Sequence, residues 1–205
     1  MRLFLTLLML CAGPSLMAAE AKKVMIGADL YSIEVLHKGQ KVTLMRNQNP
    51  DNKIDPFYQR TNQGTIQPLH PFAPHAVETI GELEMIDYLV RFSKGDNALI
   101  IIDSRTPDWV ARGTIPGAIN IPFTEFNDNE KLLEIMEKQF DVTVADVTDF
   151  TTAKTVVMFC NGIWCGQSPT AIRKLLAVGY PAAKIKYFRG GMQNWQALGL
   201  TVVKP

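Results

Sequence analysis

The pattern of hydrophobic and polar positions divides the chain into three parts. Residues 3–11 are almost all apolar, and from about residue 22 to residue 75 the pattern is irregular and interrupted by prolines. From residue 76 onwards, short apolar runs alternate with segments in which apolar residues recur every three or four positions. Short apolar runs rich in β-branched residues are typical of buried strands, and the longer spacing is typical of amphipathic helices. We therefore expect an α/β domain over residues 76–205.

Strands and helices alternate in the predicted order of elements. Strands are predicted at residues 98–102, 119–122, 155–159 and 185–188, and helices at residues 107–112, 127–140, 169–178 and 192–198. Strands separated by such helices imply a mainly parallel central sheet with helices on both faces. The reactive site of this kind of sheet lies at the carboxyl ends of its strands.

Local patterns add detail to this order. Thr79 and Glu82 have the spacing of a capping box and predict a further helix. Ser168 is a good N-cap and Pro169 a good first helical residue, so the loop after residue 159 should open on a helix N-terminus. The side chains predicted to face inward are Leu83, Ile86 and Val90 on the first of these helices, Leu132, Leu133, Met136 and Phe140 on the helix at 127–140, and Ala171, Ile172, Leu175 and Leu176 on the helix at 169–178.

The N-terminal part is predicted to lack a full core of its own. Residues 1–19 combine an early arginine, an apolar run too short to span a bilayer comfortably, a Gly-Pro break and small residues before a cleavage site. These features predict a secretory signal peptide, and hence an exported protein in the periplasm or outside the cell. Residues 20–75 should form an N-terminal extension packed on the main domain, in which residues 32–36 and 41–45 pair as a hairpin before an irregular, proline-rich stretch.

Composition and charge argue against several classes of function. The chain has 21 Lys and Arg against 20 Asp and Glu, and removal of residues 1–19, which contain Arg2, would leave 20 of each. A neutral balance gives no electrostatic basis for binding nucleic acid or an anionic membrane, and we expect no stable membrane insertion. The sequence has no Gly-rich nucleotide motif and no GxSxG, and His70 and His75 are poorly spaced as metal ligands. We expect neither a cofactor nor a metal.

The cysteines provide the candidate chemistry. Of three in the chain, Cys160 and Cys165 would remain after removal of residues 1–19, and Cys160 lies where the predicted strand at 155–159 ends. A helix N-terminus presents free N–H groups and partial positive charge to the loop before it, which favours a thiolate over a thiol. We therefore predict a lowered pKa for Cys160 and a role as a nucleophile or persulfide carrier.

Four features, taken in order, resemble a rhodanese domain. They are the strand end Ile102-Asp103-Ser104-Arg105, the segment 109–118, Cys160, and the segment that runs from Phe188-Arg189-Gly190-Gly191 through Trp195 to Gly199. The resemblance covers about residues 76–205 and implies a three-layer sulfurtransferase fold. It implies that Cys160 accepts sulfane sulfur as a persulfide and passes it to cyanide or a thiol, and that Asp103, Arg105, Gly190 and Gly191 are structural. The loop residues whose amides would form the cradle are Asn161, Gly162, Ile163, Trp164, Gly166, Gln167 and Ser168.

The sequence departs from the rhodanese pattern at three points. Thr114 stands where the family usually has histidine, the loop from Cys160 to Ser168 is longer than the common one, and no Arg, Lys or His occurs between Cys160 and Ile172. The missing cation disfavours the phosphatase and arsenate-reductase variants of the fold, because a transferring oxyanion needs a positive clamp. It also predicts weak binding of thiosulfate.

Cys165 has three alternative interpretations. In the first, it resolves a sulfenic acid or persulfide on Cys160 by forming a disulfide. In the second, it is a loop residue that packs inward beside Trp164. In the third, it is itself the nucleophile, since residues 164–168 resemble a thioredoxin-type turn. Ile163 and Trp164 either wall a pocket or anchor the loop to the extension.

The leading interpretation is an exported sulfurtransferase. It would move sulfane sulfur from a small donor, such as thiosulfate or a persulfide, through a Cys160 persulfide to a thiol or cyanide, with Cys165 in a resolving or regulatory role. One alternative is a thiol–disulfide redox protein that cycles Cys160 and Cys165 with a redox partner protein. Another is a non-enzymatic carrier that delivers bound sulfur only to a docked partner.

Overall fold

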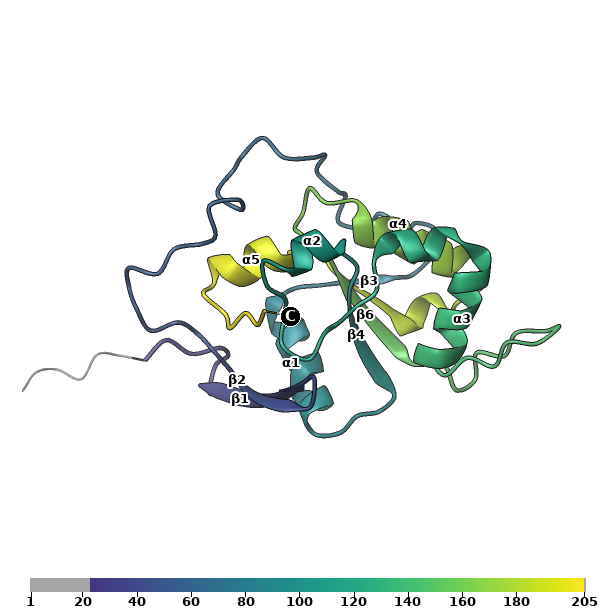
Figure 1. Ribbon diagram of the computed structural model, residues 1–205, viewed down its shortest axis with the longest axis horizontal. Helices are drawn as coiled ribbons and strands as arrows, with labels where there is room; N and C mark the ends of the chain where they lie inside the picture. Colours follow the sequence, from purple (N-terminus) through teal and green to yellow (C-terminus); the bar gives the residue numbers. More distant parts are fainter. Residues whose placement is uncertain (1–22, 205) are drawn as a thin grey trace, which may run out of the picture.

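The protein is built around a central parallel sheet in the computed structural model, which describes residues 23–204 (Figure 1). Over these residues the sheet has five strands in the spatial order β3–β7–β6–β4–β5, and every pairing is parallel. The strands are β3 (Glu78–Ile80), β4 (Leu99–Asp103), β5 (Ile119–Asn120), β6 (Thr155–Phe159) and β7 (Ile185–Phe188). Strand β6 lies in the middle and is buried apart from its first residue. The predicted α/β class and parallel sheet are confirmed.

Helices cover both faces of this sheet. They are α1 (Glu82–Ser93), α2 (Pro107–Val110), α3 (Asn129–Gln139), α4 (Gln167–Ala177) and α5 (Gly191–Ala197), with 3-10 turns at Phe123–Asn127 and Ala182–Lys184. Val157 and Phe159 of β6 share a hydrophobic cluster with α1 and α5, whereas Val156 and Met158 share a second cluster with α3 and α4. Successive residues of β6 thus face opposite layers. Figure 1 shows α3 and α4 together on one side of the sheet.

The first helix starts later than predicted. Thr79 lies in β3, a strand too short to leave a pattern in the sequence, and its hydroxyl donates to the carbonyl oxygen of Leu69. Helix α1 begins after Gly81, whose N–H donates to the Glu84 carboxylate at 3.0 Å. The predicted capping box of Thr79 and Glu82 is therefore wrong, because the residues before Gly81 pair with β7 instead.

Two predicted inward faces also need correction. In α1 the buried residues are Met85, Ile86 and Leu89, and Leu83 is 60% exposed. In α3, Leu132 and Met136 are buried, but Leu133 is 36% exposed. Leu133 follows Leu132 by one position, which turns its side chain by about 100° around the helix axis, away from the sheet.

The N-terminal extension, residues 23–75 as described, shares the core of the sheet domain. Strands β1 (Ser32–His37) and β2 (Gln40–Met45) form the predicted antiparallel hairpin, and Gly39 takes a φ of 77° in its turn. Val35 and Leu44 of this hairpin are fully buried in the cluster that also contains α1 and α5. The irregular stretch after the hairpin adds Tyr58, 2% exposed, to the same cluster.

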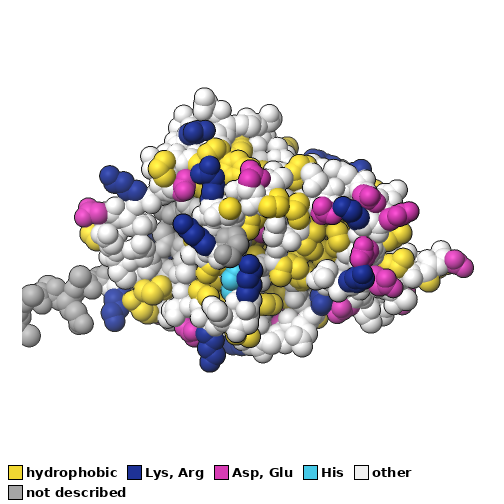
Figure 2. All heavy atoms as spheres, in the orientation of Figure 1, with side chains coloured by type: hydrophobic (Ala, Val, Ile, Leu, Met, Phe, Trp, Pro, Cys, Tyr) yellow, Lys and Arg dark blue, Asp and Glu magenta, His cyan; other side chains and the backbone are white. Residues whose placement is uncertain are grey.

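Several predictions concern the surface and the chain's N-terminus. Figure 2 shows basic and acidic side chains interspersed over the visible face. Within residues 23–204, no helix has the length and apolar character needed to cross a membrane, and no cluster of three His, Cys, Asp or Glu side chains could hold a metal ion. His70 and His75 are exposed. The predicted signal peptide, residues 1–19, lies outside the described residues.

Candidate functional site

The site begins where the middle strand of the sheet ends. Cys160 follows β6, and residues 160–166, here called the cysteine loop, lead into α4. The predicted order of strand, loop and helix is confirmed, but the predicted cap is not. Gly166 precedes the helix, and Ser168 lies inside its first turn, fully buried, with its hydroxyl bonded to the Ser104 hydroxyl at the end of β4. Ser168 therefore joins α4 to the sheet.

The backbone of the cysteine loop is fixed by the start of α5. The N–H of Met192 donates to the carbonyl oxygen of Cys160 at 3.0 Å, and the N–H of Gln193 donates to that of Asn161 at 2.9 Å. Gly191 has a φ of 54°, and a Cβ at this position would lie 2.4 Å from the Cys160 carbonyl oxygen. Only glycine allows this approach, which gives Gly191 the structural role that was expected.

The extension covers the outer side of the cysteine loop. The N–H of Gln67 donates to the carbonyl oxygen of Ile163 at 2.7 Å. The Trp164 ring lies 6.5 Å from Phe57 of the extension and 6.4 Å from Trp109, and its Nε1–H donates to Gln193. Of the two alternatives for Ile163 and Trp164, the structure therefore shows the anchor between loop and extension.

Cys160 is enclosed at the strand end. Its side chain is 1% exposed, and its Sγ–H donates to the carbonyl oxygen of Cys165 across 3.5 Å. Burial raises the pKa of the Cys160 thiol well above its usual value, and the neighbouring Cys165 adds to the rise. The N–H of Ser168 in the first turn of α4 acts in the opposite direction and is outweighed. The prediction of a lowered pKa for Cys160 is wrong, because burial exceeds the effect of the helix N-terminus.

Cys165 carries the lowered pKa instead. Its contact with the neighbouring Cys160 side chain outweighs burial, and together with the N–H groups of Gln167 and Asn161 it lowers the pKa of Cys165 to about 7. The Asn161 side-chain amide also donates to Cys165 Sγ, at 3.8 Å. Both cysteines are free thiols. The lower pKa of the pair thus belongs to Cys165 and the higher one to Cys160.

Asp103 and Arg105 form a buried ion pair beneath the loop. The Arg105 guanidinium donates to both carboxylate oxygens of Asp103, and the Thr114 hydroxyl donates to one of them at 2.7 Å. Burial acts to lower the pKa of Arg105, but the hydrogen bonds and charge of Asp103 outweigh it and raise the pKa. Asp103, Arg105 and Thr114 thus form one buried hydrogen-bonded group.

Two residues near the loop were not among the predicted site residues. Tyr58 donates its hydroxyl hydrogen to Asn161 Oδ1 at 2.9 Å and accepts from Arg105 Nη1 at 3.1 Å. Arg189 follows β7, next to Cys160 in the parallel register, and donates through Nε and Nη2 to the carbonyl oxygen of Gln67. The cation missing from the loop is thus present beside it, on the neighbouring strand.

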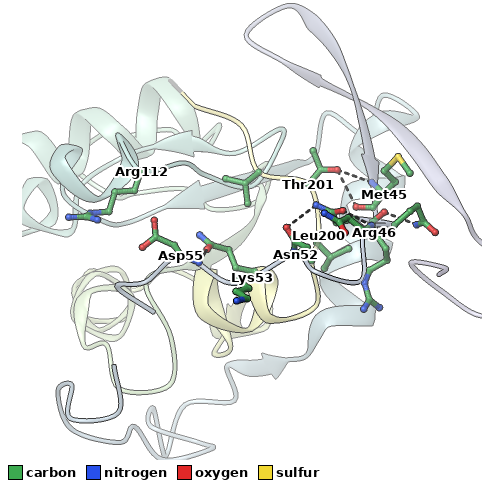
Figure 3. Close-up of a pocket in the computed structure, with 14 residues that line it drawn as sticks. Met45, Arg46, Asn52, Lys53, Asp55, Arg112, Leu200 and Thr201 are labelled. Atoms are coloured by element: carbon green, nitrogen blue, oxygen red, sulfur yellow. Dashed lines mark hydrogen bonds between the residues drawn. The ribbon is translucent and has the colours of Figure 1, made fainter. Parts of the chain in front are cut away.

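A groove of about 760 Å³ lies elsewhere on the molecule (Figure 3). The extension lines it between residues 45 and 55, together with Arg112 and residues of the C-terminal segment. Its charged side chains are Arg46, Lys53, Asp55 and Arg112, and neither cysteine is among its lining residues. This groove is therefore separate from the cysteine loop.

Comparisons with known proteins agree with this architecture. A model of the rhodanese-like domain family matches residues 86–198. The protein is an α/β protein with a cysteine directly after the middle strand of a parallel sheet that helices cover on both faces. Because the family model matches more than half of the sequence, the chain belongs to the rhodanese-like family.

Individual relatives are more distant. An HTH-type transcriptional regulator from Mycobacterium tuberculosis is 28% identical over 102 residues, which make up 50% of this chain and only 36% of that relative. Similar solved structures include thiosulfate sulfurtransferase from Pseudomonas aeruginosa, with 21% identity, 62% of this chain and 20% of that chain covered, and a TM-score of 0.46. A single-domain sulfurtransferase from Saccharomyces cerevisiae has 20% identity, 62% and 95% coverage, and a TM-score of 0.42.

Proposed function

We propose that this protein transfers sulfane sulfur through a cysteine persulfide formed in the cysteine loop, with a thiol or cyanide as acceptor. Membership of the rhodanese-like family supports a role in sulfur transfer in general. The observation that carries the finer proposal is Cys160 at the carboxyl end of the middle parallel strand, with a second thiol, Cys165, in hydrogen-bond contact with it. We place the persulfide on Cys160, the cysteine at the strand end to which the resemblance to a rhodanese domain points.

The reaction requires a thiolate and a donor with a weakly held outer sulfur. The thiolate attacks the outer sulfur of thiosulfate, a cysteine–sulfur bond forms, and the donor's S–S bond breaks with release of sulfite. Cyanide or an acceptor thiolate then attacks the outer sulfur of the persulfide and regenerates the cysteine thiolate. Arg189 beside the loop is the side chain suited to hold the oxyanion of the donor. No cofactor or metal enters these steps.

The test is the mass of the intact protein after exposure to thiosulfate and then to cyanide. The wild type should gain one sulfur atom and lose it on addition of cyanide, and the double variant Cys160→Ser/Cys165→Ser should gain none. If the wild type gains no sulfur from thiosulfate or from a small persulfide donor, the transferase proposal fails. If the double variant gains as much as the wild type, the sulfur resides elsewhere and the proposal fails equally.

A thiol–disulfide redox function is the second candidate. It is favoured by one observation, the pairing of a thiolate-forming Cys165 with an enclosed, protonated Cys160. Here the only mass change on exposure to a disulfide oxidant would be a loss of two hydrogen atoms that requires both cysteines. A carrier would gain sulfur but release it only to a partner protein and not to cyanide.

Export to the periplasm or medium remains part of the proposal, and cleavage near residue 19 would test it.

A further inference from the structure

We infer that the protein has a second binding site, in a cavity between the extension and the sheet domain, and that this site takes a small monocarboxylate with an apolar body. The cavity has a volume of about 620 Å³, and neither cysteine is among its lining residues. A volume of this size is typical of small-molecule sites. The inference goes beyond the proposed function, because no step of sulfur transfer uses this cavity.

The walls of the cavity come from both parts of the chain. The extension contributes residues 36–39, at the end of β1 and in its turn, and the sheet domain contributes Phe92 of α1, Pro107 and Val110 of α2, and residues 117–120 around β5. Two large hydrophobic side chains that line the cavity, Leu36 and Ile119, are exposed to solvent. An apolar ligand would remove these surfaces from water, which favours its binding.

One buried polar side chain of these walls has an unused donor. His37 is 8% exposed, and its Nδ1 accepts the N–H of Gly117 at 3.3 Å. Burial lowers the pKa of His37 and the charge of Lys38 lowers it further, so the ring is neutral near neutral pH. A neutral imidazole that accepts at Nδ1 carries its hydrogen on Nε2. No group of the described residues accepts from this Nε2–H.

The other neutral polar side chains of the cavity have their donors in use. The Thr114 hydroxyl donates to Asp103 at 2.7 Å, and the Asn120 amide donates to the carbonyl oxygens of Asp103 and Arg105, each at 2.8 Å. Neither side chain has a hydrogen left for a ligand. Recognition of a polar group in the cavity therefore depends on His37 and on the neighbouring Lys38.

The unpaired Nε2–H of His37 requires an acceptor from outside the chain. A buried donor without a partner is costly, and most buried polar groups in proteins are paired. Nε2 is shielded from solvent, so bulk water does not satisfy it. A ligand oxygen that an apolar body carries into the cavity would satisfy it after a small adjustment of the side chains around the ring.

The charge of the cavity selects a carboxylate as the source of this oxygen. Lys38 lines the cavity, and no Asp or Glu is among the lining residues that the structure describes. Lys38 is exposed and makes no ion pair within residues 23–204. One carboxylate oxygen can accept from the imidazole while the ammonium group of Lys38 offsets the negative charge. An ammonium ligand would be repelled by Lys38 and would bring a donor to a donor.

The test is isothermal titration calorimetry of the full chain with octanoate, octanol and octylammonium, which share one apolar tail and differ in the head group. Octanoate should bind at one site. Octanol should bind more weakly by roughly tenfold, because it has no charge and accepts less strongly. Octylammonium should not bind detectably.

Two variants separate the head group from the apolar walls. His37→Leu keeps an apolar wall and removes the donor, so it should weaken octanoate binding by roughly tenfold and leave octanol binding within about twofold. Lys38→Asn removes the charge and should weaken octanoate binding by roughly threefold to tenfold. Asparagine tolerates the φ of 50° at this position.

The matched control is Lys41→Asn. Lys41 is a lysine of the same hairpin, in β2, and does not line the cavity, so octanoate affinity should stay unchanged. His37→Gln provides a second variant should His37→Leu fail to fold. It keeps a side-chain N–H and should bind octanoate more tightly than His37→Leu or, where that variant does not fold, at close to the wild-type affinity.

Four results would overturn the inference. They are no binding of octanoate at millimolar concentration, equal affinity for octanoate and either of the other two ligands, unchanged octanoate affinity in folded His37→Leu and Lys38→Asn, and an equal loss of octanoate and octanol affinity in His37→Leu. The titration uses no sulfur donor. Its outcome therefore does not depend on sulfur transfer, and failure of either proposal can be told from failure of the other.

Discussion

The extension and the sheet domain share one hydrophobic cluster, yet they are organised by different contacts. In the sheet domain, the buried strand β6 and the apolar faces of α3 and α4 follow from regular patterns in the sequence. In the extension, regular pairing is confined mainly to the β1–β2 hairpin, and the irregular stretch is held by single hydrogen bonds to the site, such as those of Gln67 with Ile163 and Arg189. The irregular part of the extension therefore takes its shape from the site that it covers.

The largest effect is expected in the sheet domain, at the buried ion pair. Arg105→Ala leaves the Asp103 carboxylate buried without its partner and should lower the free energy of unfolding by about 3–5 kcal/mol. Chemical denaturation measures this loss.

Arg91→Ala is the matched control for the ion pair. Arg91 also makes two hydrogen bonds to an aspartate, Asp96, but its side chain is 52% exposed. Its loss should cost less than about 1 kcal/mol. Equal losses for the two variants would contradict the account of Arg105 as the buried support of the site.

A somewhat smaller effect is expected in the extension. Leu44→Ala removes a fully buried side chain of β2 and should cost about 2–4 kcal/mol in one cooperative unfolding transition. Leu36→Ala in β1 is the control, because Leu36 is 54% exposed and should cost little. If Leu44→Ala instead melts the extension in a separate transition and leaves the main one unchanged, the extension is an independent appendage.

The smallest effect concerns the pH dependence of stability. The pKa of Cys165 in the folded protein, about 7, lies below the value of about 8.5 expected in the unfolded chain. Its contribution is therefore present above the unfolded value and is lost as the pH falls towards 7. Between about pH 8.5 and about pH 6.5, the free energy of unfolding of the wild type should fall by an amount on the order of 1 kcal/mol that Cys165→Ser does not show. Chemical denaturation at a series of pH values measures this difference.

The pKa of Cys160 is shifted in the opposite direction, so its effect on the pH dependence of stability has the opposite sign. Its pKa is raised in the folded protein, so its contribution is present below the unfolded value and is lost as the pH rises above it. Cys160→Ser should leave the slope below about pH 8.5 in place and reduce the loss of stability above it. A wild-type profile that neither variant alters would contradict the assignment of thiol and thiolate.

The sequence predicted most of the sheet domain because its elements are local. Residues 155–159 are mostly apolar or β-branched and form β6 at the predicted bounds, and Gly39 marks the hairpin turn. The failures have a common physical cause. Thr79 and Ser168 have the chemistry of helix caps, but tertiary contacts with Leu69 and Ser104 determine their roles.

The site itself was only partly predictable. The position of Cys160 could be predicted from the strand before it, and the likeness to a rhodanese domain gave the family. The balance of protonation between Cys160 and Cys165 could not be predicted, because it depends on burial and on the contact between the two side chains. The hydrogen bond from Tyr58 to Asn161 could not be predicted either, since the two residues lie 103 positions apart and Tyr58 is in an irregular segment. No local spacing indicates such a contact.

The most direct test of the account is the initial rate of sulfur gain from thiosulfate by Cys160→Ser and Cys165→Ser, followed side by side by intact mass near neutral pH. The proposed function predicts that Cys165→Ser still gains one cyanide-removable sulfur atom and that Cys160→Ser gains none, because the persulfide is placed on the cysteine at the strand end. The reverse order, with sulfur gain lost in Cys165→Ser and retained in Cys160→Ser, would move the reactive thiolate away from the strand end and contradict the proposed function.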